Sequence, residues 1–218
     1  DHNGEGEATA NIQLCTAHWY GGNREQSCEN TVKSVKKLLG GIQIDGYYEL
    51  NMSEIPKLNN MVDGVTVTLE DDFSKKYPKM KKGATINLDD EQAYAYVHDR
   101  YGVGDEENTS RMKRQQQYMT GFFKKLQEKV KANPNYANEV FESLQDVSTT
   151  DITIGKISNI SNIFASGTDK GIFELAGKSK IGQALGDEID HMEFYVNKKA
   201  MVSTMSELFG IVEQKNKE

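Results

Sequence analysis

The spacing of apolar side chains predicts helices that alternate with strands along the chain. A first stripe at helical spacing predicts a helix over about residues 29–39, which the following glycine pair ends. Strict alternation of apolar and hydroxyl side chains predicts a strand over residues 65–69. The longest stripe predicts a helix from about residue 108 to residue 132. This alternation favours an α/β fold, with layers packed around a central sheet.

Weaker signals predict the remaining elements. Strands are expected at about 42–50, 84–88 and 192–196. Ser53 is a candidate N-cap for one short helix, and Asp89 or Asp90 for another. Pro134 is expected to open a helix that extends to Val147, and a closing helix is expected at 200–212. Between Ile154 and the expected strand at 192–196 the pattern weakens, and no element is predicted there.

Length and hydropathy predict one domain. The chain has 218 residues, and no stretch rich in proline, glycine or serine divides it. Residues 1–12 are polar and glycine-rich and are expected to form a loose tail. No apolar run approaches the ~20 residues that a membrane-spanning helix needs.

The charge of the chain argues against nucleic-acid binding. With 33 acidic and 26 basic residues the formal net charge is −7, whereas nucleic-acid binding needs a positive field. An anionic ligand would therefore have to be held locally.

Cys15 and Cys28 are the two cysteines of the chain. The sequence allows either a disulfide, which would fit an oxidising compartment, or two thiols. No cysteine or histidine pattern has metal-ligand spacing.

Basic residues gather between residues 98 and 118. Arg100, Arg111 and Arg114 lie near the expected start of the long helix, where unpaired N–H groups and the helix dipole favour anions. At ~100° per residue, Arg111 lies within roughly 60° of Gln115 and Tyr118 on that helix. Guanidinium groups bind phosphate oxygens in pairs, so this stretch predicts a phosphate site. The alternative is that these arginines are solvated or paired with nearby carboxylates.

An apolar stripe continues along the same helix. Met119, Phe122 and Phe123 could line a channel for a hydrocarbon tail, although residues at this spacing more often belong to a core. Likewise, His98 is either part of the site or a surface histidine, and Tyr118 either contacts the ligand or packs. The chain contains no G-x-S-x-G, H-E-x-x-H, Walker or G-x-G-x-x-G motif. Anion recognition is therefore the main chemical signal.

These residues resemble the motifs of the LytR-CpsA-Psr family. Its Y-V-R-x-R segment is similar to the stretch from Tyr96 to Arg100, and its D-x-x-R-x-x-R-Q-Q segment to the stretch from Asn108 to Gln116. Its A-Y-x-G-G, L-L-G-I-x-I-D-x-Y and V-G-G-V-x-V segments resemble residues 20–22, 38–47 and 62–67. Order and spacing agree over about residues 13–119. Residues 13–132 are accordingly the expected family core, and residues 133–218 a C-terminal part of helices and strands.

The resemblance implies an αβα sandwich with a central mixed sheet covered by helices on both faces. It also implies an extracytoplasmic phosphotransferase that moves a teichoic-acid or capsule type of glycopolymer from polyprenyl pyrophosphate to peptidoglycan, with Mg²⁺. On this analogy Arg100 and Arg111 are catalytic and stabilise charge on the phosphates. Arg114, Gln115, Tyr118, His98 and Asn108 would bind the substrate. Met119, Phe122 and Phe123 would line the lipid pocket.

Three departures from the family pattern affect these expectations. His98 replaces the first arginine of R-x-R, and histidine is only partly charged near neutral pH. Asn108 replaces an aspartate, so it can cap the helix but cannot act as a base. The family domain usually begins earlier, with strands that carry metal-binding aspartates. The Mg²⁺ ligands and a membrane anchor are therefore expected upstream, and these 218 residues alone are expected to be inactive.

The departures leave a second hypothesis from another class of protein. This hypothesis is a regulatory module of the cell envelope that binds a polyprenyl phosphate or an anionic polymer without turning it over. The replacements His98 and Asn108 favour the module, whereas the retained Arg100, Arg111 and Gln115 favour the enzyme. A purely structural envelope domain is a third possibility, and it predicts no lipid binding.

Overall fold

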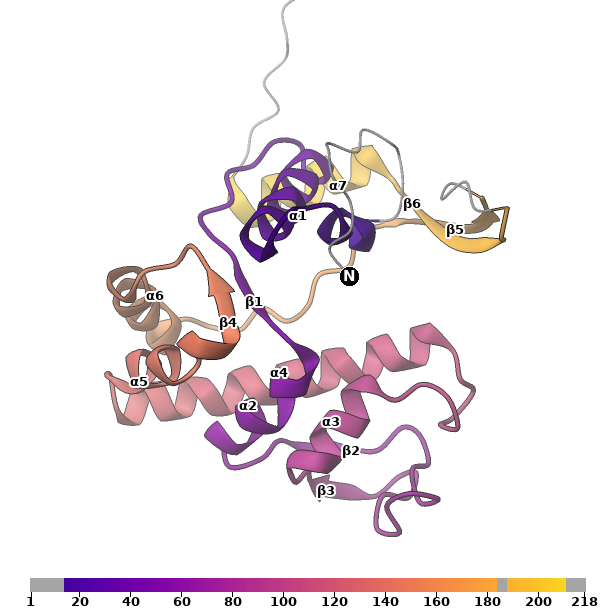
Figure 1. Cartoon of the computed structure of the whole chain (residues 1–218), viewed down its shortest axis with the longest axis vertical. Helices are drawn as coiled ribbons and strands as arrows, with labels where there is room; N and C mark the ends of the chain where they lie inside the picture. The colour runs from indigo at the N-terminus through magenta and orange to yellow at the C-terminus, as the bar shows by residue number, and fades with distance from the viewer. Residues whose placement is uncertain (1–13, 184–187, 211–218) are drawn as a thin grey trace, which may run out of the picture. The chain divides into compact units, whose positions relative to one another are not determined.

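A computed structural model describes residues 14–183 and 188–210, so the expected tail at 1–12 lies outside the described residues. The described residues form a mixed α/β structure that is mostly helical (Figure 1). They divide into two compact units. Unit 1 holds the residues up to Glu49, Thr149–Asp151 and those from Phe173 onward; unit 2 holds Leu50–Ser148 and Ile152–Ile172. The prediction of one domain remains a prediction.

Unit 1 is built around a short helix packed on a longer one. Its elements are η1 (Leu14–Trp19), α1 (Arg24–Leu38), β5 (Gly177–Gly182), β6 (His191–Val196) and α7 (Lys198–Phe209). Helix α1 begins earlier than predicted because the Asn23 side chain accepts a hydrogen bond from the Gln26 amide at 2.9 Å. Gly21 lies so close to α1 that an added Cβ would be 2.7 Å from the Ser27 nitrogen. Cys15 and Cys28 are both thiols.

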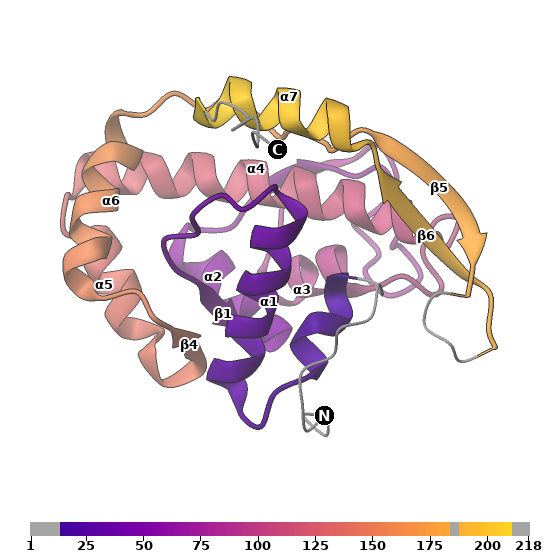
Figure 2. The same cartoon turned by 90° about the horizontal axis from the view of Figure 1, so that it is seen from above.

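Strands β5 and β6 form an antiparallel hairpin in unit 1 (Figure 2). Strand β6 confirms the predicted strand at 192–196, whereas β5 was not predicted because it contains only one large apolar residue, Ile181. Helix α7 confirms the closing helix up to Phe209, and residues 211 and 212 of that prediction lie outside the described residues.

Unit 2 contains the long helix. Its elements are η2 (Met52–Glu54), α2 (Ile55–Met61), β2 (Thr66–Thr68), β3 (Thr85–Asn87), α3 (Asp90–His98), α4 (Asn108–Ala132), α5 (Tyr136–Ser143), η3 (Gln145–Val147) and α6 (Ile154–Ser166). Helix α4 has the predicted bounds. Asp89 caps α3 through a capping box with Gln92, which confirms that prediction as well. Both views place α5 and α6 at the C-terminal end of α4 (Figures 1 and 2).

The core of unit 2 lies between the β2–β3 hairpin and helices α2, α3 and α4. Its fully buried side chains include Val65, Leu69, Met80, Leu88 and Tyr96. Asn59 connects these elements, because its amide nitrogen donates to the Leu88 carbonyl at 2.9 Å and its oxygen accepts from the Val65 amide at 3.1 Å. A buried amide that is bonded on both sides stabilises one arrangement of its neighbours.

Two parts of the predicted fold differ from the structure. The described strands pair as three separate two-stranded sheets, β1–β4, β2–β3 and β5–β6, so they do not form the expected central mixed sheet. Strands β1 (Tyr48–Leu50) and β4 (Ser148–Thr150) are three residues long, and the predicted strand 42–50 therefore shrinks to its last three residues. Helix α6 was not predicted, since Gly155 and several serines and asparagines interrupt its apolar pattern.

Two helix starts also need correction. Ser53 lies within η2 and does not cap α2, which follows directly from that turn. Pro134 lies before α5, whose N-cap is Asn135. No helix among the residues that the structure describes is long and apolar enough to cross a membrane.

Candidate functional site

The connection between α3 and α4 is held in a fixed conformation by its own side chains. The Asp105 carboxylate accepts hydrogen bonds from the Glu107 amide at 2.9 Å and from the Ser110 hydroxyl at 2.8 Å. These two hydrogen bonds lower the pKa of Asp105. The Gly102 amide donates to Glu106 at 2.8 Å. Asp105 thus accepts hydrogen bonds from the amide of the N-cap residue, Glu107, and from a hydroxyl in the first turn of α4, while Glu107 itself makes no side-chain capping bond.

Arg114 fixes this connection to the core. Only 1 % of Arg114 is exposed. Its Nε donates to the Tyr96 carbonyl at 3.0 Å, its Nη2 donates to the Asp99 carbonyl, and its Nη1 forms an ion pair with Asp71. Arg114 was expected to bind substrate, but all three of its nitrogen atoms are occupied by protein. It is a positioning residue for the segment that carries Asp99 and Arg100.

A cavity of about 420 Å³ opens beside this segment. It is lined by the end of α3, the residues that follow it and the first turn of α4: His98, Asp99, Arg100, Tyr101 and Arg111. The structure therefore brings together three of the predicted site residues, Arg100, Arg111 and His98. It adds Asp99 and Tyr101, which adjoin Arg100 in the sequence but carry no motif of their own.

Neither arginine of the cavity forms an ion pair within the described part of the chain. The Arg100 Nη2 donates to the Tyr101 hydroxyl, and its guanidinium carbon lies 4.3 Å from the centre of that ring. The Arg111 Nη2 donates to the Asn108 side-chain oxygen at 2.7 Å. The Nε atoms of both arginines are buried without a hydrogen-bond partner in the described residues. Buried donors of this kind are rare because they cost free energy, and an anion would supply the missing acceptors.

The one carboxylate of the cavity is shared between two bases. Asp99 lies 3.5 Å from the Lys76 Nζ and 3.2 Å from the His98 Nδ1. Asp99 raises the pKa of Lys76, which therefore stays protonated at neutral pH. The His98 ring stacks on Tyr94, with centroids 4.7 Å apart. Because Asp99 is already engaged by Lys76 and His98, the charge that faces the cavity from Arg100 and Arg111 is positive.

Three further predicted residues lie outside the cavity lining. Gln115 donates to the Val97 carbonyl at 2.9 Å, and the buried Tyr118 hydroxyl donates to Asn59 at 3.3 Å. Burial also raises the pKa of Tyr118, so its hydroxyl remains a donor. Asn108 is the first residue of α4 and not its cap, and it contacts Arg111 instead. A helical wheel could not show that Gln115 and Tyr118 face the core side.

The predicted lipid-binding stripe on α4 divides between the surface and the core. Met119 and Phe123 are exposed by 44 % and 45 %. Phe122 is buried and stacks on Tyr118, so it belongs to the core. Met112, which is 49 % exposed, extends the exposed stripe toward Arg111.

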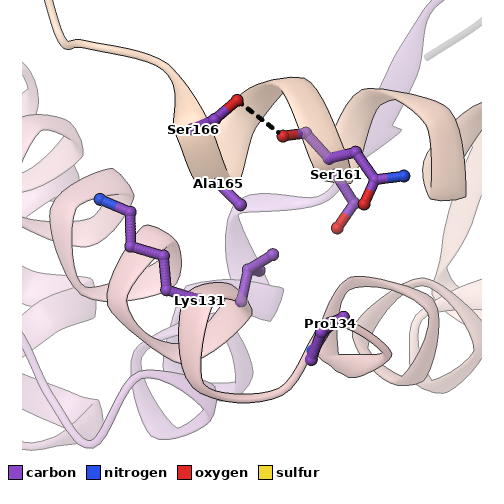
Figure 3. Close-up of a pocket in the computed structure, with 7 residues that line it drawn as sticks. Lys131, Pro134, Ser161, Ala165 and Ser166 are labelled. Carbon is purple, nitrogen blue, oxygen red and sulfur yellow. Dashed lines mark hydrogen bonds between the residues drawn. The ribbon is translucent and has the colours of Figure 1, made fainter.

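A second cavity lies near the C-terminal end of α4. Phe123 meets Phe164 of α6 edge to face, with centroids 6.3 Å apart. Beyond this contact, residues of α4, of α6 and of the connection that follows α4 line a cavity of about 240 Å³ (Figure 3). Val130, Pro134 and Ala165 give it apolar walls, while Lys131 and Ser166 supply polar groups at its edge.

A family model and several solved structures match this chain. A model of the LytR_cpsA_psr family matches residues 3–209. The protein Lin1025 from Listeria innocua has a similar fold, with a TM-score of 0.66 and 20 % identity over 94 % of this chain and 83 % of that one. TagV from B. subtilis matches with a TM-score of 0.64 and 21 % identity over 89 % and 73 % of the two chains. A structure of TagT bound to LI-WTA matches with a TM-score of 0.63 and 19 % identity over 89 % and 69 %. The comparison with curated proteins gives no match.

Proposed function

The chain belongs to the LytR-CpsA-Psr family, and from this premise we propose that its arginine cavity binds the phosphates of a polyprenyl-linked glycopolymer. The parent protein would be an extracytoplasmic phosphotransferase that moves a teichoic-acid or capsule type of polymer to peptidoglycan. The observation that carries this proposal is the pair Arg100 and Arg111. The two arginines line one cavity, and their buried Nε atoms lack acceptors within the described residues.

The chemistry of the cavity suits a pyrophosphate. Each guanidinium presents a planar fork of donors that matches two phosphate oxygens, and two forks suit two adjacent phosphates. When the bond to the leaving phosphate breaks, negative charge increases on its oxygens. Arg100 and Arg111 would stabilise that charge, which makes them the proposed catalytic residues. Asn108 would position Arg111 through its 2.7 Å hydrogen bond.

The surface of α4 offers a path for the hydrocarbon tail. Met112, Met119 and Phe123 lie along the exposed side of the helix, and Met112 directly follows Arg111. A tail that leaves the phosphate site along this stripe would remove these apolar side chains from water, at roughly 25 cal/mol per Å² of buried apolar area. The cavity between α4 and α6 lies further along the same helix and would receive more of the chain.

The described residues of the cavity do not fit a Mg²⁺ site. Asp99 is the only carboxylate among the lining residues, and it is engaged by Lys76 and His98. The described residues as a whole contain no group of three histidine, cysteine or carboxylate side chains that could hold a metal ion. Mg²⁺ therefore remains an expectation from the family, and no step of the proposed mechanism passes through it.

Relatives support the type of substrate. TagT is similar in fold to this chain and has been seen bound to LI-WTA and LIIa-WTA. We extend from this that the donor here is a lipid-linked anionic polymer of the cell envelope. Peptidoglycan as acceptor and an N-terminal membrane anchor in the parent protein belong to the same proposal.

Two features favour the second hypothesis, a module that binds without turnover. The Asn108 side chain accepts a hydrogen bond from Arg111, and an amide at this position cannot act as a base. His98 is held by Asp99 and Tyr94, and it lacks the planar fork of donors that an arginine presents. Both hypotheses use the same arginines to hold the phosphates.

Binding of farnesyl pyrophosphate, a short polyprenyl pyrophosphate, tests what the hypotheses share. In calorimetric titrations Arg111→Ala should weaken binding about tenfold or more, because one charge-assisted fork is lost. The melting temperature should not change, since Arg111 makes one hydrogen bond to its own helix turn. Normal binding by Arg111→Ala, or no binding by the unmodified chain, would refute the proposal.

Turnover separates the two hypotheses. The parent protein, supplied with Mg²⁺ and a lipid pyrophosphate-linked polymer, should transfer the polymer to peptidoglycan fragments if it is an enzyme. Retention of the intact donor on the protein, with no product, would establish the module.

A further inference from the structure

A second basic feature adjoins the arginine cavity. The connection between β2 and β3 carries five lysines, Lys75, Lys76, Lys79, Lys81 and Lys82, and residues 73–88 contain no aspartate or glutamate. All five lysines are exposed. In a chain with a net charge of −7 this is an unusual concentration of positive charge. Residues 73–84 are called the lysine loop below.

The lysine loop is folded and anchored in the core of unit 2. Phe73 and Met80 are 3 % and 0 % exposed. The Phe73 amide donates to the Met80 carbonyl at 2.9 Å, and the Gly83 amide donates to the Leu69 carbonyl at 2.7 Å. Because these buried residues hold the loop from inside, its lysines are presented on an ordered surface, which lowers the entropy cost of binding.

The loop reaches the rim of the arginine cavity. Lys76 lies 3.5 Å from Asp99, which lines that cavity. The ion pair of Asp71 with Arg114 ties the residues before the loop to the same segment. Figure 1 shows both connections, β2–β3 and α3–α4, within unit 2. A chain that leaves the phosphate site on this side would meet the lysines next.

Three of the lysines keep their charge available. Lys76 is paired with Asp99. Lys81 interacts with the Asp72 carboxylate: the pKa of Asp72 is lowered mainly by hydrogen bonds from the hydroxyl and amide of Ser74, and the charge of Lys81 contributes to that shift. Lys75, Lys79 and Lys82 form no ion pair within the described part of the chain. These three therefore make up a positive surface that the protein itself does not neutralise.

We propose that the lysine loop binds the phosphodiester chain of the polymer that the arginine cavity holds by its lipid pyrophosphate. The inference rests on the proposed function and adds a second subsite to it. A polymer with a phosphate in each repeat presents charges at regular intervals, and several exposed lysines bind such a chain by releasing its counterions. The loop would distinguish polyanionic polymers from neutral glycans, while the arginines recognise the end that all lipid-linked donors share.

Long-chain polyphosphate serves as the probe for the loop, and farnesyl pyrophosphate as the probe for the cavity. The triple variant Lys75→Gln, Lys79→Gln, Lys82→Gln should bind polyphosphate about tenfold more weakly at low salt, and the difference should disappear at high salt. Its affinity for farnesyl pyrophosphate should stay within about twofold, because the Lys76 pair and both arginines are intact. The matched control is Lys33→Gln, Lys36→Gln, Lys37→Gln on α1, which removes the same charge from another exposed cluster. The control should bind polyphosphate like the unmodified chain.

Each outcome decides one question. Equal polyphosphate affinity of the loop variant and the α1 control would overturn the inference. It would also be overturned if the loop variant lost binding to phosphatidylglycerol vesicles as strongly as to polyphosphate, because the loop would then face a membrane. If Arg111→Ala keeps its affinity for farnesyl pyrophosphate, the proposed function fails whatever the loop variant does. If Arg111→Ala loses affinity for farnesyl pyrophosphate but the loop variant binds polyphosphate as tightly as the α1 control does, the proposed function stands and the second subsite is rejected.

Discussion

Helix α4 carries one arginine on its outer face, Arg111, and one on its inner face, Arg114, and the two have different surroundings. Arg111 and Arg114 lie within one turn of each other, yet Arg114 is 1 % exposed and paired with Asp71, whereas Arg111 lines a cavity and has a buried Nε without an acceptor in the described residues. The inner arginine holds the α3–α4 connection in place. The outer arginine lines the cavity in which we propose that an anion binds.

This difference shows that the neighbours of an arginine, more than its motif, decide what it does. Both residues match arginines of the family motif. Only the inner one meets Asp71, a carboxylate that comes from 43 residues earlier in the chain. The four predictions below test whether the two faces are as distinct as the structure indicates.

The largest expected effect follows from removing the inner charge. Arg114→Met should destabilise the protein by about 3–5 kcal/mol, because Asp71 would remain largely buried without its partner and two carbonyls would lose their donor. The measurement is the free energy of unfolding in urea. The matched change Arg111→Met should cost less than about 0.5 kcal/mol, since Arg111 donates one hydrogen bond, within its own helix turn, and forms no ion pair in the described residues. Similar losses in both variants would remove the distinction between the faces.

The second-largest loss of stability is expected where the inner face of α4 packs closely against the residue that precedes β2. An added Cβ at Gly121 would lie 2.6 Å from a methyl group of Val65, which is fully buried and stiff. Overpacking costs about 1–3 kcal/mol, and the gain in helix propensity offsets up to about 1 of these. Gly121→Ala should therefore destabilise by up to about 2 kcal/mol. Gly155→Ala in α6 is the control, because its nearest neighbour is 4.0 Å away, and it should be neutral or stabilising. Stabilisation by both changes would contradict the close contact.

The sequence predicts local structure well where the determinants are local. The bounds of α4 and the cap of α3 follow from side chains within a few residues of each helix end. The amphipathic stripe of α4 was also visible, but the periodicity could not show that Phe122 faces the core while Met119 and Phe123 stay exposed. Sheet pairing, helix α6 and the roles of Arg114 and Tyr118 depend on contacts with distant residues, such as Asp71 and Asn59. In the arginine cavity, the family motif predicted Arg100, Arg111 and His98. Nothing in that motif indicated that Lys76 forms an ion pair with Asp99.

The third prediction concerns the contribution of Tyr118, on the inner face of α4, to the free energy of unfolding. Tyr118→Phe should cost about 1 kcal/mol, because its hydrogen bond to Asn59 is lost while Asn59 still accepts from the Val65 amide. Burial raises the pKa of Tyr118 above its ordinary value of 10.0. Its contribution to stability is therefore complete below about pH 10 and is lost as the pH rises through the folded-state pKa. Unfolding measured from pH 8 to 11 should show a shallower loss for Tyr118→Phe. An equal slope would mean that this hydroxyl ionises as freely in the folded chain as in the unfolded one.

The smallest effect concerns the outer face, where His98 stands in place of an arginine of the family motif. His98 lines the cavity beside Arg100 and Arg111, and its ring contacts Asp99. His98→Arg adds a permanent charge, and a third guanidinium near the phosphates should strengthen farnesyl pyrophosphate binding about two- to fivefold at pH 7.5. His98→Gln is the neutral control and should bind no more tightly than the unmodified chain. If the arginine and glutamine variants bind equally well, position 98 lies too far from the phosphates to contribute, and the outer site reduces to Arg100 and Arg111.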